Sequence, residues 1–311
     1  MSLRLMWLCC ASLLALPADS SAQSGFDYDR NAPLQLRVLG QRAYPTDVVV
    51  TDIQFTGGTP EQKQRAWLVA PREPGVRPLA AVLFVHWGGT AALTHRDQFL
   101  DEAIALARRG AVALLPDTMW ADRDWWPRRQ WDTDLAQGVN QVVALRRGID
   151  LLLSQPDVDP GRLGLVGHDL GAVYGSVLAA VDGRFHTAVL LTPTARLSDW
   201  YLQKGTPPDP AGYQRALAVL DPIDALPRLA QSPVLLQFGE TDDQVPADRI
   251  AAMAEALQST GNQSVRKYPT GHELHLEKAA RADRMAWLEG ELGLAESDSG
   301  SNGVASAPAE N

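Results

Sequence analysis

Short apolar runs alternate with longer amphipathic segments through most of the chain, and no internal repeat is visible. This alternation is typical of strands separated by helices in a mostly parallel sheet that is flanked by helices. Helices are expected over 96–109 and 135–153, and a third directly after residue 169, where Val173, Val177 and Val181 fall at helical spacing. The pattern predicts an α/β fold with strands at 48–55, 66–70, 80–85, 111–115, 163–166, 188–191 and 234–238, the first two of them an antiparallel pair.

The N-terminus has the pattern of a secretory signal peptide. Arg4 precedes an apolar run over 5–16, and small residues follow up to Ala22, after which we expect cleavage. The run is shorter than the roughly 20 residues that span a bilayer, so we expect an exported, periplasmic or secreted protein without membrane association after cleavage. An apolar N-terminus of a cytosolic protein is the alternative interpretation. Both cysteines, Cys9 and Cys10, lie in this segment, so the mature chain would contain neither a disulfide nor a thiol.

The rest of the chain divides into one domain and a tail. Residues 23–294 are expected to form the domain, with a lid-like insertion at about 193–232. Residues 295–311 are Ser, Gly, Ala and acidic residues without an apolar period, which predicts a disordered tail.

The net charge of the chain bears on which kinds of molecule it binds. A formal net charge of -9 and a pI near 5.1 give no general attraction to phosphate backbones, so a nucleic acid is not expected as a partner. The expected partner is a small-molecule substrate, and the sequence leaves the oligomeric state open.

Ligands of parallel sheets bind beyond the carboxyl ends of the strands, so the residues after each predicted strand are the first candidates for a site. The strand at 163–166 leads into Gly167-His168-Asp169-Leu170-Gly171, which fits the G-x-Nu-x-G nucleophile elbow in its setting of strand, turn and helix. Glycines permit the sharp turn, and Asp169 occupies the nucleophile position at a helix N-terminus that favours an anion.

Two further strand ends carry an acid and a base. Asp242 follows the strand at 234–238 and precedes Val245-Pro246, with Asp243 as the rival acid. His272 lies in the turn Tyr268-Pro269-Thr270-Gly271-His272 and is the candidate base. The order nucleophile, acid, histidine is that of α/β-hydrolases. Each residue also has a structural interpretation: Asp169 as a helix cap, Asp242 as a turn residue and His272 as a hydrogen-bonded imidazole.

The loop His86-Trp87-Gly88-Gly89, directly after the strand at 80–85, looks like the loop that donates one backbone N–H to an oxyanion hole. We expect Trp87 to provide this donor and Leu170 N–H to provide the other. With these motifs the chain resembles the α/β-hydrolase superfamily over residues 46–292, and within it dienelactone hydrolases and acetyl xylan esterases. It departs from these relatives at Asp169, where they have Cys or Ser.

That departure changes the expected chemistry. Attack of a carboxylate on an ester would give a reactive anhydride, whereas attack on a saturated carbon gives an alkyl ester that water activated by His272 hydrolyses. Epoxide hydrolases and dehalogenases of the superfamily work in this way, so an epoxide or halide substrate is expected. Two alternatives stay open: an ester or lactone hydrolase in which Asp169 acts without a covalent bond, and a non-catalytic binding protein on the same fold.

Aromatic residues near the predicted site are candidates for binding the substrate, although each could equally be a packing residue. No metal is expected, because His272-Glu273-Leu274-His275 lacks the H-E-x-x-H spacing, and no cofactor motif is present. The substrate-binding candidates are Trp87, Trp125, Trp126, Tyr174, Trp200, Tyr201 and Tyr213.

Overall fold

A computed structural model describes residues 24–44, 47–73, 78–88, 95–229, 232–258 and 263–294. The predicted signal peptide at 1–22 and the predicted tail at 295–311 lie outside the described residues, as does Gly89. No helix among the described residues is long and apolar enough to cross a membrane.

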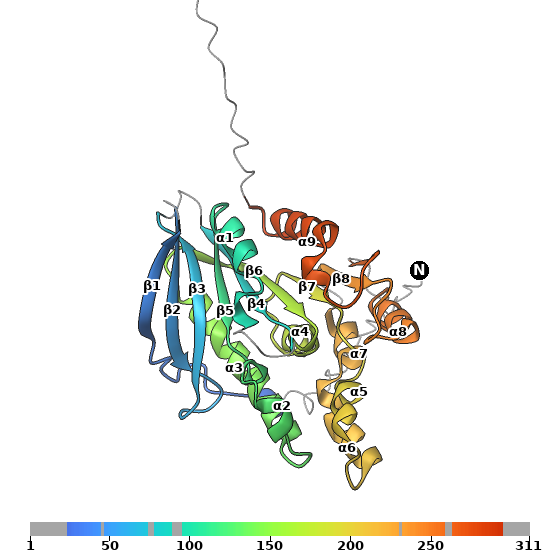
Figure 1. Cartoon of the computed structure of the whole chain (residues 1–311). Coiled ribbons are helices and arrows are strands. Elements are labelled where there is room, and N and C mark those ends of the chain that lie inside the picture. Colours follow the sequence, from blue (N-terminus) through green and yellow to red (C-terminus); the bar gives the residue numbers. More distant parts are fainter. Residues whose placement is uncertain are drawn as a thin grey trace, which may run out of the picture.

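The described strands form one sheet in the order β1-β2-β3-β5-β4-β6-β7-β8-β9 (Figure 1). The first three strands and β5 pair antiparallel in the order of the sheet, and β5, β4, β6, β7, β8 and β9 pair parallel. The fold class and the early antiparallel pair, which is β2 with β3, are therefore as predicted. The strands are β1 (Arg37–Tyr44), β2 (Val48–Thr56), β3 (Lys63–Pro71), β4 (Leu79–Val85), β5 (Ala111–Pro116), β6 (Val158–His168), β7 (Thr187–Leu191), β8 (Val234–Gly239) and β9 (Gln263–Tyr268).

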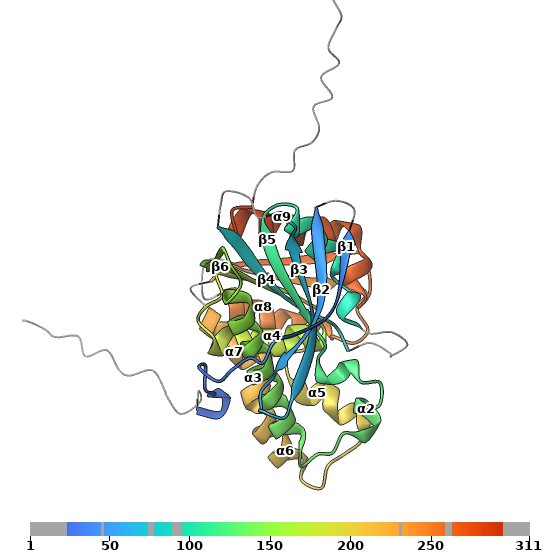
Figure 2. The same cartoon turned by 90° about the vertical axis from the view of Figure 1, so that its left-hand side faces the viewer.

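Helices cover both faces of the sheet and divide the core into two layers (Figures 1 and 2). One layer packs residues of α3, α4 and α8 against the sheet, and the other packs α1 and α9. The α-helices are α1 (Leu100–Ala107), α2 (Trp125–Arg128), α3 (Asp134–Leu153), α4 (Leu170–Val181), α5 (Leu197–Tyr201), α6 (Pro210–Leu217), α7 (Pro222–Ala225), α8 (Ala247–Gln258) and α9 (Lys278–Glu291). Short 3-10 helices include η2 (His95–Asp97) and η3 (Met119–Ala121).

The central strands are buried on both faces, as their continuous apolar runs predict. The structure differs from the prediction at β6, at α1 and at β1, and it adds β9, which was not among the predicted strands. The first half of β6, from Val158, is half-buried or exposed, so the apolar run marked only its buried half. The helix predicted over 96–109 is split at residues 98–99 into η2 and α1. The edge strand β1 is almost wholly exposed, so its sequence lacks the alternation of apolar and polar residues from which a strand is predicted.

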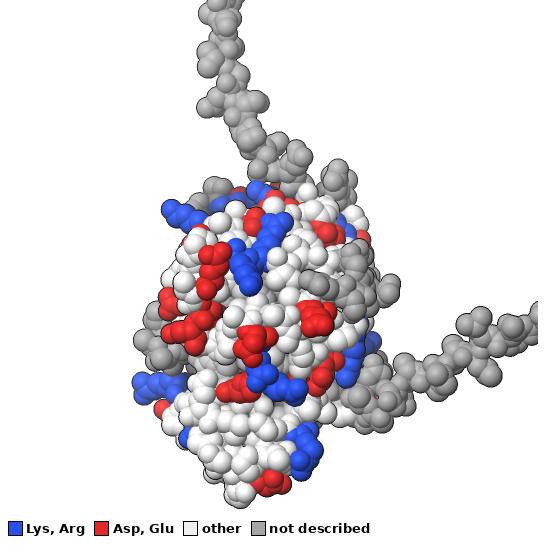
Figure 3. Space-filling model, turned by 90° about the vertical axis from the view of Figure 1, so that its right-hand side faces the viewer, with Lys and Arg blue, Asp and Glu red and all other residues white. Residues whose placement is uncertain are grey.

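The described residues of the predicted insertion at 193–232 contain the short helices α5, α6 and α7, with 3-10 turns between them. In Figure 1 these helices and α2 extend together from one end of the sheet, at the bottom of the view. Acidic and basic side chains are interspersed on the face drawn in Figure 3, which shows no extended patch of either sign.

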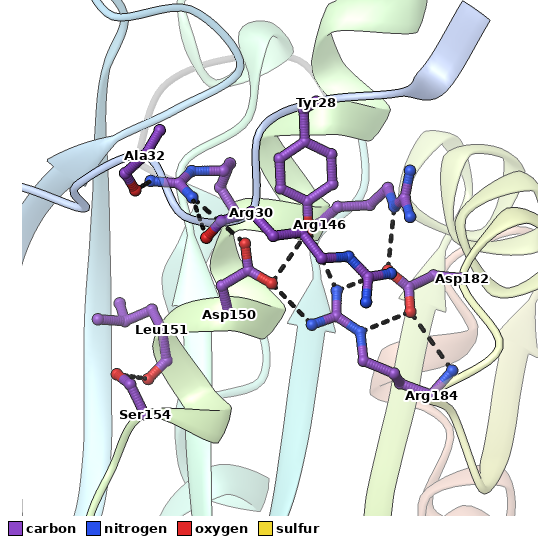
Figure 4. Close-up of polar contacts among 10 residues, drawn as sticks. Tyr28, Arg30, Ala32, Arg146, Asp150, Leu151, Ser154, Asp182 and Arg184 are labelled. Atoms are coloured by element: carbon purple, nitrogen blue, oxygen red, sulfur yellow. Dashed lines mark hydrogen bonds and ion pairs between the residues drawn. The ribbon is translucent and has the colours of Figure 1, made fainter. Parts of the chain in front are cut away.

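The segment at 24–36 is held against α3 by a buried cluster of charges (Figure 4). Arg146 donates to Phe26 O at 2.7 Å and pairs with Asp182 at 3.0 Å, and the Tyr28 hydroxyl donates to Asp150 at 3.0 Å. Arg184 joins both carboxylates, at 2.6 Å to Asp182 and 2.7 Å to Asp150. These contacts hold the pKa of Asp182 below its usual range, although burial alone would raise it.

We expect Asp182→Ala to lower the free energy of unfolding by about 3–5 kcal/mol, because it leaves the buried guanidinium of Arg146 and the partly buried one of Arg184 without this carboxylate. Urea unfolding measures this loss. Arg30→Ala is the control, because only the backbone carbonyl of Arg30 takes part in the cluster and its side chain is exposed. Equal stability of the two variants would contradict the prediction.

Candidate active site

Asp169 lies in a strained turn between β6 and α4. Its φ of 53° and ψ of -119° are unusual for a residue with a side chain, and such strain is concentrated at functional sites. The flanking glycines are required by close packing: a Cβ on Gly167 would lie 2.4 Å from Gly171 O, and one on Gly171 would lie 2.1 Å from Val85 O. The turn therefore presses the start of α4 against β4 and leaves the Asp169 side chain at the carboxyl edge of the sheet.

The structure brings together the three side chains that the sequence analysis proposed as nucleophile, base and acid. His272 Nδ1 lies 3.0 Å from Asp242 Oδ2, and His272 Nε2 lies 3.6 Å from Asp169 Oδ1. Asp242 also accepts backbone hydrogen bonds from Gln244 at 2.8 Å and Val245 at 3.0 Å. The rival residue Asp243 is exposed, and His272 contacts Asp242 instead.

The imidazole of His272 is buried between two carboxylates. Burial alone would lower its pKa, but the negative charges of Asp169 and Asp242 and the hydrogen bond to Asp242 outweigh burial and raise the pKa to about 9. Burial would likewise raise the pKa of Asp242, but His272 and the backbone N–H groups hold it below its usual range. With this pKa, the His272 ring is an imidazolium at neutral pH, and its charge is balanced by the carboxylates on either side.

The second Asp169 oxygen is held by the loop after β4. Gly88 N–H donates to Asp169 Oδ2 at 2.9 Å. The Trp87 N–H donates instead to Gln98 Oε1 at 2.9 Å, so the prediction that Trp87 provides the oxyanion donor is wrong by one residue. Leu170 is the first residue of α4, where a backbone N–H has no acceptor within the helix. The N–H groups of Gly88 and Leu170 are thus the candidate donors at Asp169.

A cavity of about 500 Å³ opens beside this loop. It reaches Gly88, whose N–H contacts Asp169, and four tryptophans form its apolar wall. The predicted residues Trp125, Trp126 and Trp200 lie in this wall, and Trp120 joins them. The lining residues are Gly88, Trp120, Asp122, Arg123, Asp124, Trp125, Trp126, Pro127, Trp200 and Gln203.

Four other predicted substrate contacts are absent from this lining. The Tyr174 and Tyr201 hydroxyls are fully buried and lie 2.7 Å apart, and Tyr174 stacks on the cavity residue Trp120 with ring centroids 5.1 Å apart. The Tyr213 hydroxyl donates to Asp134 at 2.6 Å. Trp87 stacks on His168 with ring centroids 5.6 Å apart. These side chains pack behind the cavity wall. They contact other side chains, whereas the sequence analysis expected them to contact the substrate.

The sequence analysis did not identify Gly88 as the donor, nor Gln98 and Gln203 as residues of the site. Gly88 belongs to the loop that the sequence analysis recognised, but the analysis assigned the donor to the residue before it. Gln98 and Gln203 belong to no motif, so nothing in the sequence singles them out. Among the described residues, no group of three His, Cys, Asp or Glu side chains could hold a metal ion.

Comparison with solved structures gives relatives of the same fold. Acetyl xylan esterase from Paenibacillus sp. R4 is 20% identical with a TM-score of 0.68, over 86% of this chain and 92% of that chain. Acetyl xylan esterase 1 from Thermoanaerobacterium sp. JW/SL YS485 is 15% identical with a TM-score of 0.63, over 86% and 92%. A protein from Klebsiella pneumoniae subsp. pneumoniae MGH 78578 assigned as a dienelactone hydrolase is 16% identical with a TM-score of 0.59, over 79% and 98%. These likenesses confirm the predicted α/β-hydrolase fold.

At the level of sequence, no curated protein matches the chain significantly. The sequence profile of the prolyl oligopeptidase family, peptidase S9, matches residues 128–297. This region contains the elbow, the acid and the histidine. Because the match spans more than half of the 311 residues, the chain belongs to the prolyl oligopeptidase family and is a hydrolase of the α/β-hydrolase fold.

Proposed function

We propose that this hydrolase displaces a leaving group from a saturated carbon of a small organic substrate and forms a covalent alkyl ester at Asp169. The observation that carries the proposal is the pairing of the Asp169 carboxylate with two partners, Gly88 N–H on Oδ2 and His272 on the Oδ1 side. A carboxylate nucleophile suits displacement at carbon, because its attack on an ester or peptide carbonyl would give an anhydride. The name of the family therefore does not decide the reaction of this chain.

In the first step Asp169 Oδ1 attacks, because Oδ2 is engaged by Gly88. The bond from Oδ1 to the substrate carbon forms, and the leaving group departs with its electron pair. Asp169 is then a neutral ester, so the imidazolium of His272 loses one of its two carboxylate neighbours. Its pKa falls, so it releases a proton to solvent water and becomes a base at the stage where a base is needed.

In the second step His272 Nε2 takes a proton from a water molecule that attacks Cγ of Asp169. The charge that develops on Oδ2 is stabilised by the N–H groups of Gly88 and Leu170. Collapse breaks the bond between Cγ and Oδ1, and His272 returns the proton to the departing alcohol. The alcohol product therefore carries the original Oδ1, and Asp169 regains an oxygen from water. The second proton of that water passes from the new Asp169 carboxyl group to His272, which restores the carboxylate and the imidazolium.

Two indole groups favour a halide as the leaving group. Trp125 Nε1 and Trp200 Nε1 are buried and have no hydrogen-bond partner among the described residues, and both tryptophans line the cavity. An indole N–H is a donor only, and each of these nitrogens lies too deep for solvent to reach, so a departing anion would satisfy it once the indole turns toward the cavity. An epoxide would instead need an acid, and the candidate tyrosine hydroxyls are absent from the cavity lining.

A single turnover in heavy-oxygen water is expected to label the Asp169 carboxylate and leave the first product unlabelled. In His272→Gln the alkyl ester should accumulate as a mass adduct while turnover falls by about 10²–10⁴-fold, because only the second step needs the base. Mass spectrometry of the active-site peptide measures both, with haloalkanes, haloacids, epoxides, lactones and aryl esters as substrates and Asp169→Asn as the control. Label in the product alone would indicate a non-covalent ester or lactone hydrolase. Absence of both turnover and adduct would indicate a binding protein.

We expect the His272 imidazole to titrate with a midpoint near pH 9, and at lower pH in Asp169→Asn, which removes one neighbouring charge. Because the pKa is raised on folding, the stabilisation is fully present below about pH 6.5 and is lost as the pH rises through about 9, with a slope of up to about 1.4 kcal/mol per pH unit. NMR titration and unfolding at several pH values measure this. Asp243→Asn is the control, and a midpoint near 6.5 in the wild type would contradict the expectation.

Trp125→Phe and Trp200→Phe should each slow ester formation by about 10-fold or more with alkyl chlorides, and less with iodides, which are better leaving groups. Rapid-quench measurement of adduct formation in the His272→Gln background detects the difference. Trp131→Phe is the matched control, because Trp131 packs on Tyr213 at 5.4 Å and is absent from the lining of this cavity. Equal rates in all three variants would remove the case for a halide.

A further inference from the structure

Both peptide groups of Trp87 are held by side chains. Its N–H donates to Gln98 Oε1 at 2.9 Å, and its carbonyl oxygen lies 2.8 Å from His86 Nδ1. The Trp87 carbonyl and the Gly88 N–H belong to one planar peptide group and point in opposite directions. Holding the carbonyl therefore fixes the direction in which Gly88 N–H donates to Asp169.

The partners of His86 determine its tautomer. Thr118 N–H donates to His86 Nε2 at 3.3 Å, and the Thr118 hydroxyl lies 2.9 Å from the same atom. A backbone N–H can only donate, so Nε2 carries no proton and the ring proton is on Nδ1. His86 Nδ1–H then donates to the Trp87 carbonyl. The ring is buried, with 1% of its residue surface exposed, so no bulk solvent competes for these bonds.

The partners of His168 impose the opposite tautomer. Gln98 Oε1 accepts from Trp87, so the Gln98 amide nitrogen faces His168 Nδ1 at 2.6 Å and donates to it. The His168 proton is then on Nε2, which donates to His272 O at 3.1 Å. Full burial, with the nearby His275 and His272, holds the pKa of His168 well below its usual range, which keeps the ring neutral.

We propose that His86, Gln98 and His168 are positioning residues, in which two neutral histidines of opposite tautomer hold the Trp87–Gly88 loop and the His272 loop in register with Asp169. The proposal rests on the proposed function, since it assumes that Gly88 N–H and His272 act on the Asp169 ester. None of the three side chains touches the reacting atoms. Their hydrogen bonds join the ends of β4 and β6 to the turn at His272.

The consequence for the reaction falls on the second step. Hydrolysis of the ester needs Gly88 N–H at the developing oxyanion, and loss of one such donor slows comparable reactions by about 10²–10³-fold. Formation of the ester needs no base, and there Gly88 N–H only engages Oδ2 while Oδ1 attacks, so formation depends far less on that donor. A loosened Trp87 loop should therefore slow hydrolysis far more than formation.

The first test needs no turnover and uses the full chain labelled with ¹⁵N-histidine. At pH 7 the ¹⁵N NMR spectrum should include a neutral ring protonated at Nδ1, which belongs to His86, and a neutral ring protonated at Nε2, which belongs to His168. His275, whose pKa burial and the nearby charges lower to about 4, adds a further neutral ring. Single variants His86→Asn and His168→Gln identify the two signals among the six histidines. Either ring in the other tautomer, or His168 charged at pH 6, would overturn the proposal. If both tautomers are as expected but no Asp169 ester forms with any substrate, the hydrogen-bonded arrangement is supported and only the proposed function is rejected.

The second test separates positioning from general stability. Gln98→Leu should change the ¹⁵N signals of His168 and slow ester hydrolysis by about 10²–10³-fold, with ester formation changed by less than about threefold. The matched control is Gln237→Leu, because Gln237 is a buried glutamine that also makes two hydrogen bonds, to Tyr268 and Ala280 O. It should lower the melting temperature without changing the ratio of the two rates. Equal slowing of both steps in Gln98→Leu would overturn the proposal.

Rescue by a conservative variant gives an independent readout. In His86→Asn the side-chain amide can place a donor where Nδ1–H lies, so hydrolysis should stay within about tenfold of the wild-type rate. In His86→Leu the donor is lost, and hydrolysis should fall as in Gln98→Leu. Equal loss in both variants would show that the Nδ1 donor is not what matters. If His86→Leu fails to fold, Gln98→Leu and the NMR test still decide.

Discussion

The imidazole of His272 lies between two carboxylates that are themselves almost fully buried, with 3% of the Asp169 side chain and 1% of the Asp242 side chain exposed. Two buried anions so close together need a compensating cation, and the shared imidazolium supplies it. This balance depends on the strand order. Residues after β6, β8 and β9 meet at one edge of the sheet because the strands that carry them are parallel and close together. The same balance makes the base sensitive to the charge of Asp169.

An aspartate at the elbow changes which group the oxyanion donors stabilise. In the proposed reaction the attacked carbonyl belongs to the protein, since the tetrahedral intermediate forms at Asp169 Cγ. The cavity then has no carbonyl group to recognise. It needs only to hold an apolar carbon and a departing group, and a wall of four tryptophans with two unpaired indole N–H groups fits that task. The proposed alkyl ester on Asp169 would form in the same turn that holds His168, which is the neighbouring residue.

A second buried ion pair supports the aromatic wall. Arg129 and Asp134 pair at 2.8 Å, with 1% of each side chain exposed, and Tyr213 donates to the same carboxylate. The Arg129 guanidinium also lies 3.8 Å from the centre of the Tyr201 ring and 4.7 Å from that of Trp126. Breaking a buried ion pair costs several kcal/mol of folding free energy. These contacts therefore fasten the segment that contains α2 onto the helices α5 and α6. Tyr201 and Tyr213 therefore have a physical reason to be present that does not require contact with substrate.

Periodicity and local motifs determined the α/β fold, most of the central strands, and the elbow, because both express short-range rules of backbone and burial. The exposed strand β1 escaped these rules, since an edge strand without a buried face leaves no alternation to detect. Tertiary structure alone decided which polar atoms meet: Gly88 with Asp169, 81 residues away, and Gln98 with His168, 70 residues away. A hydrogen bond needs an alignment of donor and acceptor that residue types do not specify. The sequence therefore singled out the candidate groups Asp169, Asp242 and His272, and packing decided which donors and supports surround them.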